Sequence, residues 1–354
     1  MSADSPATSP PASASAGTAP AVGSAAPGPP VAEAPAAHHR SVREGCGLLD
    51  RSERGKLAVT GGEAADFLNG LLTNDILALS LGAGCGAALL DHKGKMLAEL
   101  RVIRTPPPTE ELWLDCERVC LQELFDGLRR FGVGYAAELH KRTVQQGLIS
   151  LAGPHVAEVA SVAAGQTEPL ETGPPEHANR WIELGDDRAL AIATDFGLDL
   201  VCEAEATARV RQALLAAGAE AVQEGAFECL RVERGRPRYG IDIDNTTIPQ
   251  EAGLNARLVN FDKGCYVGQE TVARLHYKGK PNRHLRGLGL SDPAPAGSEL
   301  RLGEKVVGHL GTVAVSPGRG PIALALVRRE AQPGAELSVA GGEASARVVE
   351  LPFS

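Results

Sequence analysis

Apolar residues recur at helical spacing in several stretches of the chain. Between residues 63 and 72, Phe67, Leu68 and Leu71 fall on one face of a helix. Gly218 follows an alanine-rich stretch and is a typical helix stop. Helices are therefore predicted over residues 63–72, 118–130, 153–164, 206–217 and 224–234.

Short apolar runs between these helices predict strands, because polar turns that contain glycine bound them. Gly94, in the polar turn 91–95, indicates a hairpin, and residues 47–61 predict two short strands around another turn. Strand–helix–strand–strand–helix groups thus occur twice, which predicts an α+β fold with a duplicated unit. The remaining predicted strands of this region cover residues 85–90, 96–103, 112–115, 148–151, 181–184, 188–193 and 198–203.

The two ends of the chain differ from this middle region. Residues 281–354 carry short alternating strands separated by glycine turns, which predicts a C-terminal antiparallel β-barrel. Residues 1–42 are rich in alanine, proline and serine, so we expect a disordered tail, and prolines interrupt the apolar run that a signal peptide needs. His38-His39, at the edge of this tail, is expected to be solvated rather than to bind metal. Residues 43–280 form the predicted α+β region of two subdomains.

Composition narrows the functional classes. The 354 residues carry a formal net charge of −9, which argues against a dedicated nucleic-acid binder. The seven cysteines include no Cys-x-x-Cys pair, so neither a disulfide framework nor a zinc or iron–sulfur ligand set is indicated. No run of about 18 apolar residues occurs, so no membrane span is predicted. We expect a soluble, cytoplasmic protein.

The stretch Lys263-Gly264-Cys265-Tyr266-Val267-Gly268-Gln269-Glu270 carries the most suggestive chemistry. Glycines at 264 and 268 allow an unusual turn around Cys265, and Lys263 could stabilise its thiolate. The alternative is a structural turn with a small buried cysteine, since free cysteines are usually buried. Both interpretations remain open on spacing alone.

Three motifs together resemble the YgfZ family of folate-binding proteins, relatives of the glycine-cleavage aminomethyltransferase (T-protein). They are Arg-x-Glu-x-Gly-x-Pro from residue 231, Ile-Pro-Gln-Glu from residue 248, and the cysteine stretch continued to Arg274. The resemblance covers about residues 45–354. It implies duplicated ferredoxin-like, folate-binding subdomains with a C-terminal β-barrel, tetrahydrofolate as cofactor, and a role in assembling or maintaining iron–sulfur clusters of client proteins.

The same resemblance suggests where the folate and the chemistry lie. Cys265 would be the reactive group and Lys263 would tune it. The transferases carry a partly matching pterin-binding turn at residues 194–199, so Asp195 and Asp199 are expected at the pterin. Arg231 is expected to bind the acidic folate tail. Two residues of the cysteine stretch, Tyr266 and Gln269, complete the predicted folate contacts.

Aminomethyl transfer is the first alternative function. The transferases resemble this chain at residues 91–102 but carry an Asp-Asp pair, one of which is catalytic, where this chain has Ala98-Glu99. Loss of a carboxylate there would remove a group that helps to move a proton, which favours folate binding over methylene transfer. A second alternative is a non-catalytic scaffold that binds no folate. Neither a membrane nor a nucleic acid is an expected partner.

Overall fold

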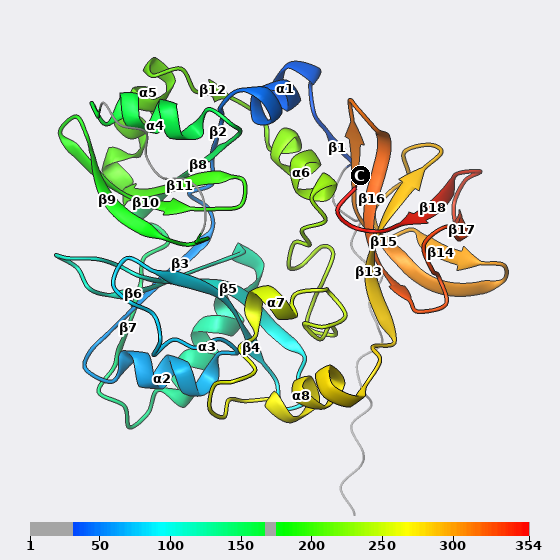
Figure 1. The fold of residues 1–354 in the computed structure, drawn as a ribbon, viewed down its shortest axis with the longest axis horizontal. Coiled ribbons are helices and arrows are strands. Elements are labelled where there is room, and N and C mark those ends of the chain that lie inside the picture. The colour runs from blue at the N-terminus through cyan, green and yellow to red at the C-terminus, as the bar shows by residue number, and fades with distance from the viewer. Residues whose placement is uncertain (1–30, 167–174, 354) are drawn as a thin grey trace, which may run out of the picture.

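The computed structural model describes residues 31–166 and 175–353 of the chain. Two sheets face each other, and a third lies beside them (Figure 1). Helix α6 (Glu224–Glu233) and the segment that follows it run between the two facing sheets and the third sheet. No helix within the described ranges combines the length and apolar character that crossing a bilayer would require.

The first subdomain is a five-stranded antiparallel sheet with two helices on its outer face. Its sheet order is β4-β5-β6-β3-β7. Phe67 and Leu68 of the first helix and Leu124 and Leu128 of the second are buried against the sheet. Along the chain the elements are β3 (Gly55–Thr60), α2 (Ala64–Leu71), β4 (Gly84–Leu90), β5 (Met96–Arg104), β6 (Leu112–Cys116), the short 3-10 helix η1 (Arg118–Cys120), α3 (Leu121–Phe131) and β7 (Glu138–Lys141).

The second subdomain repeats this arrangement. Its sheet order is β12-β2-β8-β11-β10-β9, so the run β9-β10-β11-β8-β2 corresponds position by position to β4-β5-β6-β3-β7. A helix follows the strand equivalent to β3, and another follows the strand equivalent to β6, as in the first subdomain. Its elements are β2 (Gly47–Asp50), β8 (Gln146–Ala152), α4 (Val156–Ala163), β9 (Asn179–Leu184), β10 (Asp187–Ala193), β11 (Gly197–Glu203), the 3-10 turn η2 (Ala204–Ala206), α5 (Thr207–Ala216) and β12 (Glu220–Ala221).

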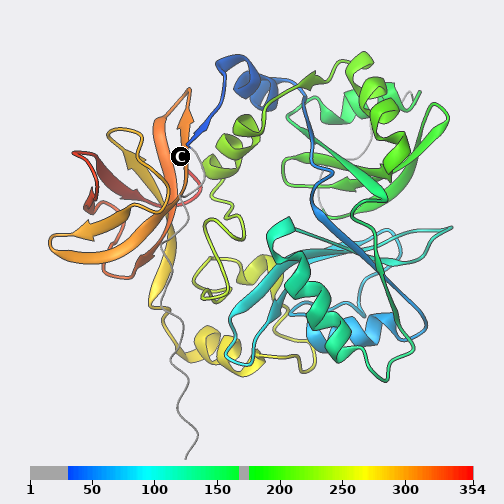
Figure 2. The ribbon, with the colours of Figure 1, turned by 180° about the vertical axis from the view of Figure 1, so that it is seen from behind.

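The inner faces of these two sheets pack against each other. Trp113 of β6 meets Trp181 of β9 edge-on, with ring centroids 5.8 Å apart. Ile103, Leu190 and Ile192 are buried around this contact. With helices on the outside and sheets on the inside (Figure 2), polar side chains on the inner faces can line an enclosed site. The duplicated α+β prediction is confirmed in this form.

The C-terminal region is a closed six-stranded antiparallel barrel, as predicted. It closes because β15 pairs with β16 as well as with β14. Its core consists of aliphatic side chains such as Leu288, Leu300 and Val313. The strands are β13 (Arg283–Leu290), β14 (Glu299–Leu302), β15 (Lys305–Ser316), β16 (Gly320–Arg328), β17 (Glu336–Val339) and β18 (Ser345–Val349).

Part of the predicted disordered tail is ordered. Residues 1–30 lie outside the described residues, but β1 (Ala32–Glu33) pairs with β15, and α1 (Ala36–Glu44) packs on α6. The composition of residues 1–42 predicts disorder, and this is wrong for α1 because Val42 is buried against the apolar face of α6. The two strands predicted around residues 47–61 exist as β2 and β3, but they belong to different sheets. Two later helices are α7 (Asn255–Leu258) and α8 (Gln269–Lys278).

Candidate functional site

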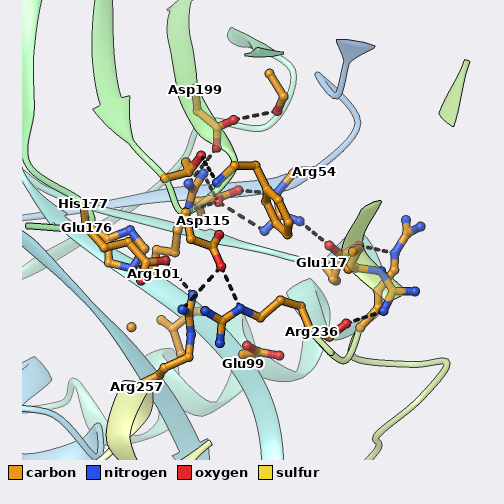
Figure 3. A pocket seen from close by; sticks show the side chains of 18 of the residues that line it. Arg54, Glu99, Arg101, Asp115, Glu117, Glu176, His177, Asp199, Arg236 and Arg257 are labelled. Carbon is orange, nitrogen blue, oxygen red and sulfur yellow. Dashed lines mark hydrogen bonds and ion pairs between the residues drawn. The ribbon is translucent and has the colours of Figure 1, made fainter. Parts of the chain in front are cut away.

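A cavity of about 370 Å³ lies between the two facing sheets and the segment after α6. This volume falls within the range of about 300–1,000 Å³ that small-molecule sites occupy. Figure 3 shows that charged side chains from both sheets converge on it. The first sheet contributes β4, β5 and β6, the second contributes β8 and β11, and α6 and residues 236–239 form a third wall.

A network of arginines and carboxylates joins the two sheets at the base of the cavity. Arg101 of β5 donates from Nε to Asp115 Oδ2 at 2.6 Å and from Nη1 to Asp199 Oδ2 of β11 at 2.6 Å. Arg54 adds an Nε–Oδ1 hydrogen bond of 2.8 Å to Asp115. Burial would raise the pKa of Asp115, but Arg101 and Arg54 outweigh it and hold that pKa well below its usual range. These charges are therefore fixed in place by their partners.

Glu99 stands apart from this network. Along β5, Ala98 is fully buried in the core beneath the sheet, whereas Glu99 and Arg101 point to the opposite face and line the cavity. Within the described residues, the Glu99 carboxyl makes no hydrogen bond or ion pair. Burial, aided by the nearby charge of Glu117, raises the pKa of Glu99 to about 7. A carboxyl that titrates near neutral pH can both accept and donate a proton.

The opening of the cavity carries a second group of ion pairs. Asp195 accepts a 2.6 Å hydrogen bond from Arg236 and lies 3.5 Å from Arg257, which also pairs with Glu176 at 2.5 Å. Side chains of Arg236 and Arg257 are 35% and 28% exposed, so a ligand can reach them. Arg257 and Arg236 are therefore better placed than the deeper arginines to meet an incoming anion.

Aromatic faces line the same cavity. Phe196, Phe227 and Tyr239 all contribute to its wall. The Tyr239 hydroxyl donates to the carbonyls of Met96 and Leu97 at 2.9 Å, which fixes its ring. Flat heteroaromatic groups pack well on such faces, and the carboxylates nearby can accept their N–H groups. The wall thus combines the two kinds of contact that a pterin requires.

Three of the predicted folate contacts lie in this wall: Asp195, Asp199 and Arg231. Asp199 is held by Arg101 and by the Ser150 hydroxyl at 2.6 Å.

Arg231 uses all five of its N–H donors within the protein. They bind Glu228, Asp242, Thr312 and the Arg236 carbonyl. Arg231 therefore has a structural role in this geometry, and it offers no free donor to a folate tail.

The cysteine stretch lies outside the cavity lining. Cys265 is exposed, in the turn that precedes α8. The Lys263 ammonium donates to the carbonyls of Asn69, Leu72 and Asn74 at 2.6, 2.7 and 2.9 Å. These carbonyls lie at the C-terminal end of α2, where unpaired backbone acceptors favour a cation. Stabilisation of the Cys265 thiolate by Lys263 stays a prediction. The three hydrogen bonds give the lysine a structural role at the end of α2.

The remaining residues of the stretch shape its contact with the β4–β5 turn. Gly268 has φ +81°, and a side chain there would collide with the Asp91 carbonyl oxygen, so glycine is required. Gly264 faces open space. Tyr266 is buried in the core of the first subdomain, where burial raises its pKa to about 12, and Gln269 begins α8. Folate contacts by Tyr266 and Gln269 stay predictions.

Sequence reasoning missed several cavity residues. Arg54, Arg101, Asp115 and Glu117 were not singled out, because ion pairs between distant strands leave no local pattern. His177 was missed as well. It lines the cavity, and burial with the charges of Arg101 and Arg257 lowers its pKa to about 3, so it is neutral. One signal was available: the alternation Leu97, Glu99, Arg101 in a predicted strand places two charged groups on one face.

Comparison with known proteins agrees with this architecture. Residues 23–263 match the model of the GCVT N-terminal domain. An aminomethyltransferase from Symbiobacterium thermophilum is 30% identical over 339 aligned positions, in a match that covers 89% of this chain and 88% of that protein. One from Streptomyces coelicolor is 30% identical over 337 residues, with the same coverage of 89% and 88%.

A solved structure has the same fold. The glycine cleavage aminomethyltransferase T of Bartonella henselae superposes with a TM-score of 0.77 at 23% identity, over 90% of this chain and 89% of that one. The fold and cavity define an α+β protein with two related subdomains, a site between them and a flanking barrel. By sequence, the chain belongs to the GCVT N-terminal domain family, whose relatives named here are aminomethyltransferases.

Proposed function

We propose that this protein binds tetrahydrofolate in the central cavity and transfers a one-carbon unit to it, in a reaction of the aminomethyltransferase type. The observation that carries the proposal is Glu99. Of the two positions at which the transferases carry an Asp-Asp pair, residue 98 faces the core and residue 99 faces the cavity. Glutamate therefore supplies a carboxylate at the position that faces the cavity, and alanine occupies only the position that faces the core.

The proton balance of such a transfer suits one carboxyl that titrates near neutrality. The methylene group exchanges its bonds to the amine and to the carrier sulfur for bonds to two folate nitrogens, and in each exchange a folate N–H loses a proton while the departing amine or thiolate gains one. Glu99, with a pKa of about 7, is populated in both forms at neutral pH and can take the first proton and return the second. Asp195 would meet the pterin edge, and Arg257 or Arg236 the acidic tail.

The test is folate-dependent release of ammonia from an aminomethylated lipoyl carrier protein. We expect turnover by the wild type and a loss of about 10²- to 10⁴-fold in Glu99→Gln, the usual contribution of a positioned acid–base group. Glu304→Gln, an exchange at an exposed turn, is the matched control. Calorimetry with tetrahydrofolate should give similar affinity for both variants. Absence of turnover by the wild type would refute the transfer reaction, and absence of tetrahydrofolate binding would favour a scaffold.

A role in iron–sulfur cluster maintenance is the second candidate, and the exposure of Cys265 favours it. The other six cysteines are buried or partly buried, so Cys265 alone among the seven presents its thiol to partners. The resemblance to the YgfZ family rests on the stretch that contains it. Here we expect Cys265→Ser to fail to restore iron–sulfur enzyme activities in a deletion strain, while Cys202→Ser, at a buried thiol away from the cavity, restores them. Full rescue by Cys265→Ser would exclude the thiol from that role.

A further inference from the structure

Three potential metal ligands meet on the side of α6 that faces away from the cavity. His39 projects from α1, and Cys229 and Glu233 lie one turn apart on α6, so both point to the same face. Their ligand atoms all lie within 4.8 Å of one another. The composition around His39 predicts the opposite, a solvated side chain at the edge of a disordered tail. Its side chain is 12% exposed because α1 is ordered.

The spacing of these atoms is close to that of a coordination sphere. His39 Nε2 lies 3.0 Å from Glu233 Oε1, and Cys229 Sγ lies 3.7 Å from the same oxygen. A tetrahedral ion with bonds of about 2.0–2.3 Å holds its ligand atoms roughly 3.3–3.7 Å apart. Small side-chain movements would therefore convert the hydrogen-bonded cluster into a ligand set.

Burial sets this cluster apart from a surface group. The Glu233 side chain is 5% exposed, and Cys229 is fully buried. Among the described residues, Glu233 Oε2 is buried without a hydrogen-bond partner, although Arg43 lies 3.4 Å away as an ion pair. The Ser316 hydroxyl of β15 donates to Oε1 at 2.7 Å and offers a fourth oxygen beside the cluster. A buried carboxylate oxygen that lacks a hydrogen-bond donor is well suited to a cation.

We propose that His39, Cys229 and Glu233 form a binding site for a zinc-class divalent cation that fastens α1 to α6 and the barrel. One imidazole nitrogen, one sulfur and one carboxylate oxygen are ligands that Zn²⁺ accepts together. On binding, the sulfur–metal bond forms as the thiol proton leaves to solvent, and the imidazole proton moves from Nε2 to Nδ1, which frees Nε2 to bind the ion; thiolate and carboxylate together balance the charge of the ion. The site is separate from the cavity and does not depend on the proposed function.

Cobalt is a suitable probe because tetrahedral Co²⁺ bound to a thiolate absorbs visibly and in the near ultraviolet. The full chain, stripped of metal by a chelator, is titrated with Co²⁺ and then with Zn²⁺. We expect a thiolate charge-transfer band that saturates at one Co²⁺ per chain and disappears as Zn²⁺ displaces the cobalt. Zn²⁺ should also raise the unfolding midpoint of the wild type, since a ligand that binds the folded state stabilises it.

Two variants and two controls make the assignment specific. Cys229→Ser should abolish the charge-transfer band, and His39→Gln, which keeps an amide donor for Glu233, should weaken Co²⁺ binding by about 100-fold or more. Cys202→Ser, at a buried thiol of the second subdomain, and Cys265→Ser, at the exposed thiol, should leave the band unchanged. If Cys229→Ser does not fold, His39→Gln decides. Three results would overturn the proposal and leave a purely hydrogen-bonded cluster. They are the absence of the charge-transfer band in the wild type, a band that survives in the decisive variant, and a band that is lost in Cys265→Ser.

Discussion

Replacement of Glu99 by glutamine should stabilise the protein, and the gain should grow with pH. The folded-state pKa of Glu99 is raised from an ordinary 4.5 to about 7. Between these values the folded chain binds a proton that the unfolded chain has lost, so wild-type stability falls as pH rises through this window. Above pH 7 both states are ionised, and the folded state bears the full cost of a carboxylate in the cavity wall. Glutamine has the same shape and no charge, so it avoids that cost.

The size of the effect follows from the two pKa values. A pKa raised from 4.5 to about 7 corresponds to about 3 kcal/mol at high pH, at 1.36 kcal/mol for each tenfold change. At pH 5 the unfolded state is already partly ionised, which leaves a penalty of about 1 kcal/mol. The advantage of Glu99→Gln over the wild type should therefore increase by about 2–3 kcal/mol between pH 5 and pH 8.

Urea unfolding at pH 5 and pH 8 measures the stability advantage of Glu99→Gln directly. The dependence of the free energy of unfolding on urea concentration should not change with a single isosteric exchange, so a shift of the midpoint reports stability. Glu304→Gln controls for removal of a carboxylate as such, and its effect should stay within about 0.5 kcal/mol at both pH values. An advantage of Glu99→Gln that does not grow with pH would mean that Glu99 ionises normally. The proposed acid–base role would then lose its physical basis.

Three further predictions concern the surrounding structure. Asp115→Asn should destabilise the protein by about 3–5 kcal/mol in urea unfolding at pH 7, because it leaves two buried arginines short of a partner; a loss below 1 kcal/mol would contradict this. Lys263→Met should lower stability by about 2–4 kcal/mol, since three carbonyls lose a charged donor, while Cys265→Ser should change it by less than about 0.5 kcal/mol. Equal losses of stability for Lys263→Met and Cys265→Ser in thermal melts would instead indicate that Lys263 acts through the cysteine. Gly268→Ala should cost more than about 2 kcal/mol and Gly264→Ala almost nothing, and a reversed order would refute the turn geometry.

Most elements of the fold could be predicted because local patterns encode them. The apolar face around Phe67 and the alternation along the barrel strands each specify one element and the side that it buries. The pairing of elements could not be predicted in the same way. β2 and β3 are separated by a four-residue turn yet join different sheets, because burial of Leu48 and Leu57 in separate cores outweighs local pairing. Such choices depend on contacts that are distant in sequence.

The site was predicted less completely, and for a related reason. A partly matching turn motif at residues 194–199 predicts Asp195 and Asp199 as folate contacts, and both residues line the cavity. Glu99 was noticed, but a strand pattern does not say which of two neighbouring residues faces the ligand until the core side is known. The buried ion pairs of Arg101 join β5 to β11 across 98 residues of sequence, so no spacing rule reveals them.

Among the described residues, the cavity wall includes none from the barrel, yet hydrogen bonds make the shape of the cavity depend on it. Asp242 is buried and accepts the Thr312 backbone N–H of β15 at 2.7 Å through Oδ1. Its Oδ2 accepts Arg231 at 2.7 Å and the Arg238 backbone N–H at 2.8 Å. One carboxylate thus anchors both α6 and the segment around residue 238 to the barrel. Because these two elements form the third wall of the cavity, the barrel acts as a support that sets the shape of the site from behind.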